Sequence, residues 1–312
     1  MSSPLVSVLI PVFNGKRYLA ECLDSVLAQD LQDFEILIAD DGSTDGSPAL
    51  IEDYARREPR IRWWRNTGNL GIGGNFNACL REARGEFVKY VLQDDKLLRP
   101  EALRRMVEVI RTDDAVTLTV TASHLIDAQS RLVEVRKPFR RSGVRDGRGV
   151  IVRCLEANAN VIGEPSLALF RRNMSSRGFD EGLKQLLDLE MWYHLLEQGS
   201  FGYVAEPLCA FRQHPAQLSA ANQRTSALDD ENLALLERYL REPWMKQAIT
   251  RQAVFTSLYY LRKRSGLRAA AMREDIAGRF GARSYPLYWI KHKVTRPFRN
   301  LSRWLARRGL RL

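Results

Sequence analysis

The chain has 312 residues, of which 45% are hydrophobic and 27% are charged, a composition typical of a folded globular protein. No apolar run approaches the roughly 18 residues needed to cross a bilayer, and the first residues lack the basic start and long apolar stretch of a secretory signal. The four cysteines are far apart and form no Cys-x-x-Cys, which argues against a zinc site or a disulfide framework and favours reduced, buried thiols in a cytosolic protein.

Charge is distributed unevenly along the chain. Residues 241–312 hold 18 Lys and Arg against 3 Asp and Glu, a net of +15, whereas the whole chain is +11, which leaves −4 for residues 1–240. We therefore expect a mildly acidic domain at 1–220, followed by a basic, mainly helical region at 221–312. The basic region predicts a polyanionic partner, either nucleic acid or an acidic membrane leaflet.

Strand and helix patterns alternate through the first hundred residues. Short apolar, β-branched runs bounded by turn residues predict strands, and apolar residues recurring at helical spacing predict amphipathic helices between them. The expected strands are 6–13, 34–39, 61–64 and 87–92, and the expected helices are 19–27, 48–57 and 74–84. This alternation predicts an α/β fold with a mostly parallel sheet and helices on both of its faces.

Three of these strands end in polar turns: Asn14-Gly15, Asp40-Asp41-Gly42 and Gln93-Asp94-Asp95. The carboxyl ends of parallel strands meet at one edge of the sheet, where ligands bind, so the turns predict a single acidic crevice. The paired aspartates of the third turn repel each other unless a divalent cation or a cationic ligand lies between them. They are equally well explained as caps of the turn before a helix that opens near Pro100.

Six segments, taken together and in chain order, resemble those of family-2 glycosyltransferases with the GT-A fold. They are residues 6–15, 39–45, 66–71, 85–95, 188–192 and 212–215. Each segment alone is weakly specific, but the ordered set at these spacings is highly specific and covers about residues 5–220. The resemblance implies a Rossmann-like GT-A domain with a C-terminal helical extension, and an enzyme of the hexosyltransferase type that uses a nucleotide-sugar donor.

The resemblance also implies roles for single residues. Contacts to the donor nucleotide are implied at Pro11, Phe13, Asn14, Asp41, Asn69, Gln93 and Asp94. Asp95 and His214 are implied as ligands of Mg²⁺ or Mn²⁺, and Arg212 and His214 as contacts of the diphosphate. One departure is Leu92, which stands where the family's Asp-x-Asp-Asp has its first aspartate.

Asp188 matches the position of the family's catalytic base, although Leu187 replaces the glutamate that usually precedes it. Without the resemblance, a solvated carboxylate at the start of a helix explains Asp188 better. Glu190 cannot share its helical face, because residues two apart point away from each other, so only one of the two is expected to reach the crevice. We choose Asp188, because Met191, Trp192 and Leu195 then form a buried stripe with Leu187. Glu164 falls where the family's acceptor site is expected, and an exposed turn explains it equally well.

Together these residues predict inverting transfer of a sugar from a UDP- or dTDP-sugar to a hydroxyl of a saccharide or lipid-linked saccharide, in surface polysaccharide biosynthesis. A sugar-nucleotide nucleotidyltransferase is one alternative, but the turn after the first strand lacks that class's Gly-rich, Arg/Lys-bearing loop. A non-catalytic nucleic-acid binder is another. It leaves the acidic crevice unexplained, and no stacking platform for single strands is evident, so we expect no nucleic-acid partner.

The basic C-terminal region carries helical patterns with aromatic anchors. Trp289 and Trp304 lie among apolar and Lys or Arg residues within 285–308, a pattern suited to the interface of an anionic membrane. A basic helix that packs on the catalytic domain is the alternative. We expect a cytoplasmic protein that associates peripherally with the inner face of the plasma membrane.

Overall fold

A computed structural model describes residues 3–157, 159–215, 217, 227–239 and 241–245, together with residues 274, 278 and 290. The predicted membrane-binding helices at 285–308 lie almost entirely outside the described residues. The chain forms two compact units: residues 1–151 with 160–224, and residues 152–159 with 225–312. The predicted domain division at residue 220 stays a prediction, since 218–226 lie outside the described part of the chain.

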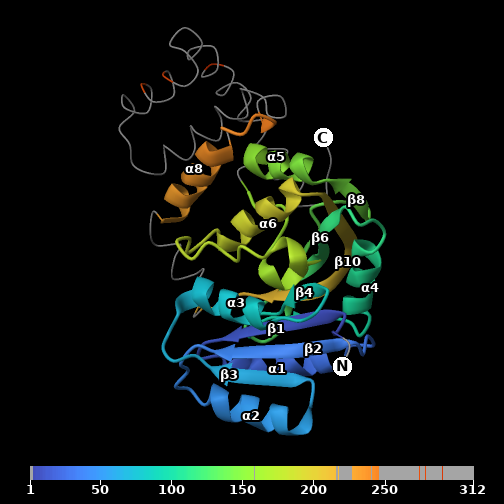
Figure 1. Cartoon of the computed structure of the whole chain (residues 1–312), viewed down its shortest axis with the longest axis vertical. Coiled ribbons are helices and arrows are strands. Elements are labelled where there is room, and N and C mark those ends of the chain that lie inside the picture. Colours follow the sequence, from blue (N-terminus) through green and yellow to red (C-terminus); the bar gives the residue numbers. More distant parts are fainter. Residues whose placement is uncertain are drawn as a thin grey trace. The chain divides into compact units, whose positions relative to one another are not determined.

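The first unit is built on one mixed sheet, and Figure 1 shows its strands β1, β2 and β3 lying side by side, with α2 beyond β3. The strand order is β3-β2-β1-β4-β9-β6-β10-β5, with β7 added to β6 and β8 to β10. The described strands are β1 (Val6–Val12), β2 (Phe34–Asp40), β3 (Ile61–Arg65), β4 (Phe87–Tyr90), β5 (Lys96–Leu97), β6 (Val116–Ile126), β7 (Leu132–Arg136), β8 (Gly143–Asp146), β9 (Ala168–Arg171) and β10 (Ser200–Arg212).

Helices flank this sheet. Those described in the two units are α1 (Lys16–Leu27), α2 (Ser47–Arg57), α3 (Gly71–Glu82), α4 (Ala102–Ile110), α5 (Gly147–Ala157), α6 (Leu187–Glu197) and α8 (Ala227–Tyr239), with short 3₁₀ turns η1 (Pro165–Leu167) and η2 (Arg172–Met174). The predicted α/β class is confirmed, and the first four strands of the order, β3 to β4, are parallel as predicted. Beyond β4 the sheet changes character, because β9 runs antiparallel to both of its neighbours.

The core follows from the sequence pattern. All seven residues of β1 are buried, as expected for a strand covered on both faces. In α1 the buried residues include Leu19, Cys22, Leu23 and Val26, the apolar stripe that the periodicity predicts. All four cysteines are buried, which confirms the expected packing of the thiols.

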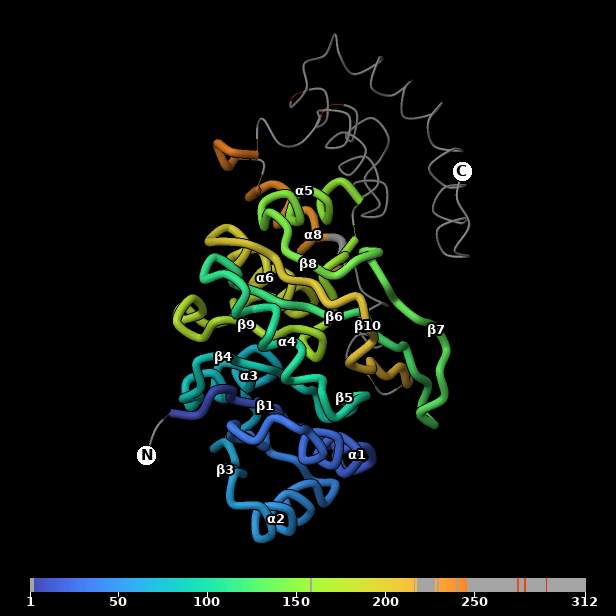
Figure 2. The backbone as a smooth tube through the Cα atoms, turned by 90° about the vertical axis from the view of Figure 1, so that its right-hand side faces the viewer, coloured from blue at the N-terminus to red at the C-terminus, as the bar shows by residue number. Residues whose placement is uncertain are grey.

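The second half of the sheet carries an exposed edge. Strand β7 runs antiparallel to the end of β6 and, in Figure 2, lies at the side of the first unit in green. Its Leu132, Val133 and Val135 side chains are exposed. No helix among the described residues is long and apolar enough to cross a membrane.

Candidate functional site

The parallel register of β1 with β2 and β4 brings their carboxyl ends to one edge of the sheet. The turns after β1 and β4 are joined directly, since Gln93 Oε1 accepts the Phe13 N–H at 2.8 Å and Gln93 Nε2 donates to the Phe13 carbonyl at 2.9 Å. Pro11 is buried in the strand, whereas the Phe13 side chain is 48% exposed. Phe13 therefore offers an aromatic face at the mouth of the predicted crevice.

The turns after β1 and β2 are also joined. The Asn14 N–H donates to Ser43 Oγ at 2.8 Å, and Asn14 Oδ1 accepts the Thr44 N–H at 2.9 Å. Asn14 has a φ of 51°, a left-handed conformation that asparagine tolerates better than most residues. At Gly15 a Cβ atom would lie 2.3 Å from Gln93 Oε1, so any larger residue there would displace the Gln93 side chain that joins these turns.

Asp41 points inward and binds the chain itself. Its Oδ1 accepts the Leu70 N–H at 2.8 Å and its Oδ2 accepts the Gly71 N–H at 3.0 Å, and Asn66 Nδ2 donates to it at 2.9 Å. The carboxylate thus satisfies the free N–H groups at the start of α3 and complements the helix dipole there. Asp41 is only 2% exposed, so the structure gives it a role in folding, and its implied contact with the nucleotide stays a proposal.

Asn69 supports the same helix start. Its side-chain Oδ1 accepts the Gly71 N–H at 3.0 Å, and its Nδ2 donates to the Asp41 carbonyl at 3.3 Å. The residue remains exposed on the surface of this turn. It therefore lies next to Asp41, in the turn before α3, and its implied contact with the nucleotide stays a prediction.

The two aspartates after β4 occupy different environments. The Asp94 side chain is 18% exposed, and its Oδ2 lies 3.0 Å from His214 Nε2. Asp95 is 1% exposed, and its Oδ1 accepts the Arg212 N–H at 2.9 Å. The structure thus pairs His214 with Asp94, whereas the resemblance implied His214 and Asp95 as the joint metal ligands.

The pKa of the buried Asp95 carboxyl is shifted by its surroundings. Burial, and after it the negative charge of Asp94, raises the pKa of Asp95 well above its ordinary value. The Glu164 carboxylate acts on it in the same direction. The carboxyl groups of Asp94, Asp95 and Glu164 therefore lie close enough to interact electrostatically.

A divalent cation fits this arrangement. Asp95 Oδ2 is buried and has no hydrogen-bond partner among the described residues, and Asp94 offers a second carboxylate beside it. Carboxylate oxygens are the ligands that Mg²⁺ and Mn²⁺ prefer. In the described part of the chain no group of three Asp, Glu, His or Cys side chains lies together as a metal site, so other ligands would have to come from a bound diphosphate and water.

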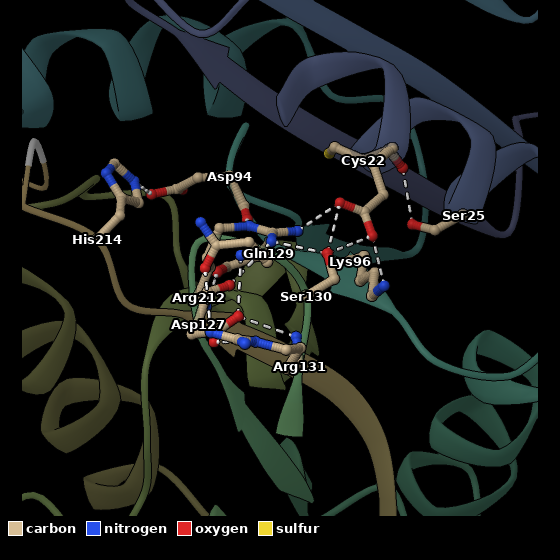
Figure 3. Close-up of polar contacts among 12 residues, drawn as sticks. Cys22, Ser25, Asp94, Lys96, Asp127, Gln129, Ser130, Arg131, Arg212 and His214 are labelled. Carbon is tan, nitrogen blue, oxygen red and sulfur yellow. Dashed lines mark hydrogen bonds and ion pairs between the residues drawn. The ribbon is translucent and has the colours of Figure 1, made fainter. Parts of the chain in front are cut away.

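Arg212 is not placed as the resemblance implied. Its side chain is 1% exposed, and its guanidinium donates to the Asp94 carbonyl at 2.7 Å, the Asp127 carbonyl at 3.1 Å and Ser130 Oγ at 2.8 Å. Figure 3 shows Arg212 among these partners, with His214 on the far side of Asp94. These contacts use the guanidinium within the protein, so of the two implied diphosphate contacts only His214 stays at the surface of the site.

Asp188, the candidate base, and Glu190, two residues later on α6, lie in different surroundings. Glu190 is 1% exposed, and its Oε2 lies 2.6 Å from Arg177 Nη2, within the protein. Asp188 is half-buried, and its Oδ1 accepts the Leu189 N–H at 2.8 Å. Glu190 is thus held by an ion pair with Arg177, and the role of Asp188 as the base stays a prediction.

The turn that carries Glu164 links α6 to the end of β4. Trp192 Nε1 donates to the Gly163 carbonyl at 3.0 Å, and Trp192 lies one helical turn after Asp188, on the same face of α6. At the other side of the turn, the Leu92 N–H donates to Ser166 Oγ at 2.9 Å. The helix face of Asp188 and the Asp94-Asp95 segment therefore converge on this turn.

Glu164 itself is held by an ion pair. Its Oε1 lies 2.8 Å from Arg136 Nη1, and its side chain is 26% exposed. The carboxylate is thus fixed in place but still accessible. This placement suits the implied acceptor contact, which stays a proposal.

The chain matches the family "Glycosyl transferase family 2" over residues 7–175, more than half of its length. It belongs to this family. It is 32% identical to the uncharacterized protein MT1568 of Mycobacterium tuberculosis over 69% of both chains. It is 28% identical to a chondroitin synthase of Escherichia coli, over 64% of this chain and 28% of that one.

Solved structures share the fold. The S. aureus TarS fragment 1–349, in complex with UDP-GlcNAc, matches with a TM-score of 0.61 at 17% identity, over 90% of this chain and 72% of that one. The mannosyltransferase PcManGT of Pyrobaculum calidifontis, with GDP-Man and Mn²⁺, matches with a TM-score of 0.59 at 20% identity, over 98% and 85%. The GT-A fold and the glycosyltransferase class are thereby confirmed, and neither alternative function is carried further.

Sequence reasoning missed the partners of Arg212. Glu21, on α1, approaches its guanidinium to 2.5 Å across 191 positions of sequence. Glu21 also contacts Lys96 at 2.5 Å and Ser130 at 2.8 Å. No local signal marks these residues, because each looks like an ordinary polar side chain on a helix or turn.

Proposed function

We propose that this glycosyltransferase transfers a sugar, with inversion, from a nucleoside diphosphate sugar to a hydroxyl of a saccharide or lipid-linked saccharide. The observation that carries the proposal is that the turn of Glu164 is hydrogen-bonded both to Leu92, just before the Asp94–His214 pair, and to α6, the helix of Asp188. The TarS fragment is in complex with UDP-GlcNAc and the mannosyltransferase with GDP-Man, which supports a donor of this class.

The donor would lie over the turns after β1, β2 and β4. Phe13 provides an exposed ring against which a base can stack. The Gln93 side chain holds the main chain of Phe13 through two hydrogen bonds. Asn14, Asn69 and Asp41 shape the rest of the nucleotide contact. A UDP- or dTDP-sugar is the donor we favour from the sequence.

Asp95 would hold Mg²⁺ or Mn²⁺ with one further protein ligand, Asp94 or His214, and the donor's diphosphate and water would supply the other ligands. The cation would neutralise charge on the leaving group as the sugar–oxygen bond breaks. Asp95 contributes its buried, unpartnered Oδ2, and Asp94 and His214 face the surface of the site. The structure with GDP-Man also holds Mn²⁺, which supports a divalent cation here.

Asp188 would act as the general base. It accepts the proton of the acceptor hydroxyl while that oxygen forms a bond to the anomeric carbon, on the face opposite the diphosphate. The bond between that carbon and the diphosphate oxygen breaks, and the nucleoside diphosphate leaves with its electron pair. Such proton transfer contributes about 10²–10⁴-fold in rate.

Glu164 would hold the acceptor's hydroxyls, since its ion pair with Arg136 fixes its position. We further propose a role in surface polysaccharide biosynthesis. For this role the basic C-terminal region would bring the enzyme to the anionic inner face of the plasma membrane.

The test is a transfer assay with UDP-, dTDP- and GDP-sugars and saccharide acceptors, read by nucleoside diphosphate release and by the anomeric configuration of the product. We expect release with one donor class and an inverted linkage. The Asp188→Asn variant should lose at least about 10²-fold in turnover while it binds the donor normally. Normal turnover by this variant, or a retained configuration, would refute the mechanism.

A further inference from the structure

The side chain of Arg212, at the end of β10, is the centre of a hydrogen-bond network that joins four parts of the first unit. Its Nε donates to the Asp94 carbonyl at 2.7 Å, and its Nη1 donates to the Asp127 carbonyl at 3.1 Å and to Ser130 Oγ at 2.8 Å. Its Nη2 lies 2.5 Å from Glu21 Oε2. Figure 3 shows Arg212 among Asp94, Asp127 and Ser130.

These contacts leave the guanidinium poorly placed for a ligand. The side chain is 1% exposed, and one of its faces lies 4.4 Å over the Tyr18 ring. A donor phosphate would have to displace Glu21 or Ser130 to reach it. Breaking a buried charged hydrogen bond is costly, so direct contact with the diphosphate is disfavoured.

The main chain of Arg212 acts on the same aspartates. Its N–H donates to Asp95 Oδ1 at 2.9 Å, while its side chain holds the Asp94 carbonyl. Two residues later, His214 lies 3.0 Å from Asp94 Oδ2. Gln217 Nε2 donates to the Arg212 carbonyl. Arg212 therefore contacts both aspartates, and His214 contacts one of them.

The far end of the network is anchored on α1. Tyr18 and Glu21 lie three positions apart, on one face of that helix. The Tyr18 ring lies 5.0 Å from the His214 ring, and Glu21 is held by Lys96 Nζ at 2.5 Å and by Ser130 Oγ at 2.8 Å. Helix α1 begins directly after the Phe13–Gly15 turn, so the network connects the nucleotide side of the site to its metal side.

We infer that Arg212 is a positioning residue, anchored by Glu21. Arg212 holds Asp94 and His214 in a fixed position relative to the Phe13–Gly15 turn and does not itself contact the donor. This inference rests on the proposed function for its consequences in donor binding. The placement of His214 by Arg212 and Glu21 does not depend on that function and can be measured separately.

The test compares Glu21→Gln, Arg212→Lys and a matched control, Arg131→Gln. Arg131 lies in the same turn as Ser130, but its side chain is 76% exposed and its ion pair is with Asp127. Glu21→Gln removes the charge that anchors Arg212 and leaves Asp94 and His214 unchanged. Because the Glu21 side chain is 38% exposed, we expect this variant to fold, and it keeps the test valid if Arg212→Lys fails to fold.

The first readout needs no donor. The chain has four histidines, and the His214 ring signal in an NMR spectrum is assigned by its loss in His214→Asn. We expect this signal to shift or broaden in Glu21→Gln and in Arg212→Lys, and to stay in place in Arg131→Gln. An unmoved His214 signal in a folded Glu21→Gln variant would overturn the inference.

The second readout is the Mn²⁺ concentration needed for half-maximal binding of a nucleoside diphosphate. Residues that orient metal ligands typically change metal affinity about 10–100-fold when replaced, and we expect a rise of that size in Glu21→Gln and none in Arg131→Gln. If Arg212 instead contacted phosphate, Glu21→Gln would free its guanidinium, and binding would stay the same or tighten. Absence of Mn²⁺-dependent binding by the unmodified chain would count against the proposed function, while the His214 signal would still decide the role of Arg212.

Discussion

Replacement of Asp41 by asparagine separates its role in folding from its proposed role in donor binding. The Asp41 carboxylate accepts the Leu70 N–H, the Gly71 N–H and one Asn66 N–H, at 2.8–3.0 Å. An asparagine of the same shape has only one oxygen. In either orientation its NH₂ group therefore faces a backbone N–H at the start of α3, and two buried donors meet.

The magnitude follows from these contacts. Loss of a charge-assisted hydrogen bond, together with an unsatisfied buried donor, costs about 2–3 kcal/mol. For a folded unit of this size each kcal/mol lowers Tm by roughly 2–4 °C, so the loss corresponds to roughly 4–12 °C. The helix dipole at the same position acts in the same direction, because it favours a negative charge.

The assay is thermal unfolding of Asp41→Asn without nucleotide, with Asp53→Asn as the control. Asp53 lies on α2, its side chain is 48% exposed, and its partners are Arg56 and Arg57. Its replacement should change stability by less than about 0.5 kcal/mol. If Asp41→Asn melts at the temperature of the unmodified chain, the carboxylate does not hold α3, and the reasoning fails.

Three further predictions concern the site. Phe13→Ala should weaken nucleotide binding by about 1–3 kcal/mol through lost stacking and leave Tm nearly unchanged, because Phe13 is 48% exposed; calorimetric titration and thermal unfolding measure the two effects. Glu190→Gln should lower Tm, since it removes the charge that pairs the buried Glu190 with Arg177, yet keep far more turnover than Asp188→Asn; the reverse order of turnover would make Glu190 the base. Burial raises the pKa of Glu21, but hydrogen bonds from Lys96 and Ser130 and the Arg212 charge outweigh it, and the net pKa is lowered. The stabilising contribution of the Glu21 carboxylate is therefore complete above the ordinary pKa of 4.5 and is lost as the pH falls through the lowered pKa. The Tm difference between the unmodified chain and Glu21→Gln should therefore narrow below about pH 4.5. A Tm difference that stays constant with pH would contradict the ion pair of Glu21 with Arg212.

The first half of the fold was predictable because its signals are local. Apolar runs of strand length, alternating with helical periodicity, predicted β1 to β4 and the helices between them. Helix α3 begins at Gly71, three residues before the predicted start. The reason is the Asp41 carboxylate, which caps that helix from another turn, and such a long-range cap leaves no mark in the helix sequence.

The second half of the sheet was not predicted. Strand β9 pairs antiparallel with β4 and β6, and such pairing is set by packing between segments far apart in the chain. In the candidate site, too, the local motifs were visible in the sequence and the long-range contacts were not. The resemblance proposed Asp94, Asp188 and His214 from short motifs, but the ion pair of Glu21 with Arg212 spans 191 positions, and only the folded chain shows that Arg212 is buried.

The central claim is that the edge of the sheet binds a nucleotide-sugar through a divalent cation. Calorimetric titration of the full chain with UDP-, dTDP- and GDP-sugars, with and without Mn²⁺, tests it most directly. We predict that one donor class binds in the presence of Mn²⁺, that chelation of the metal abolishes binding, and that Asp94→Asn reduces it while Asp53→Asn does not. Binding that is equally strong without metal and in Asp94→Asn, or no binding of any of these donors, would contradict the account.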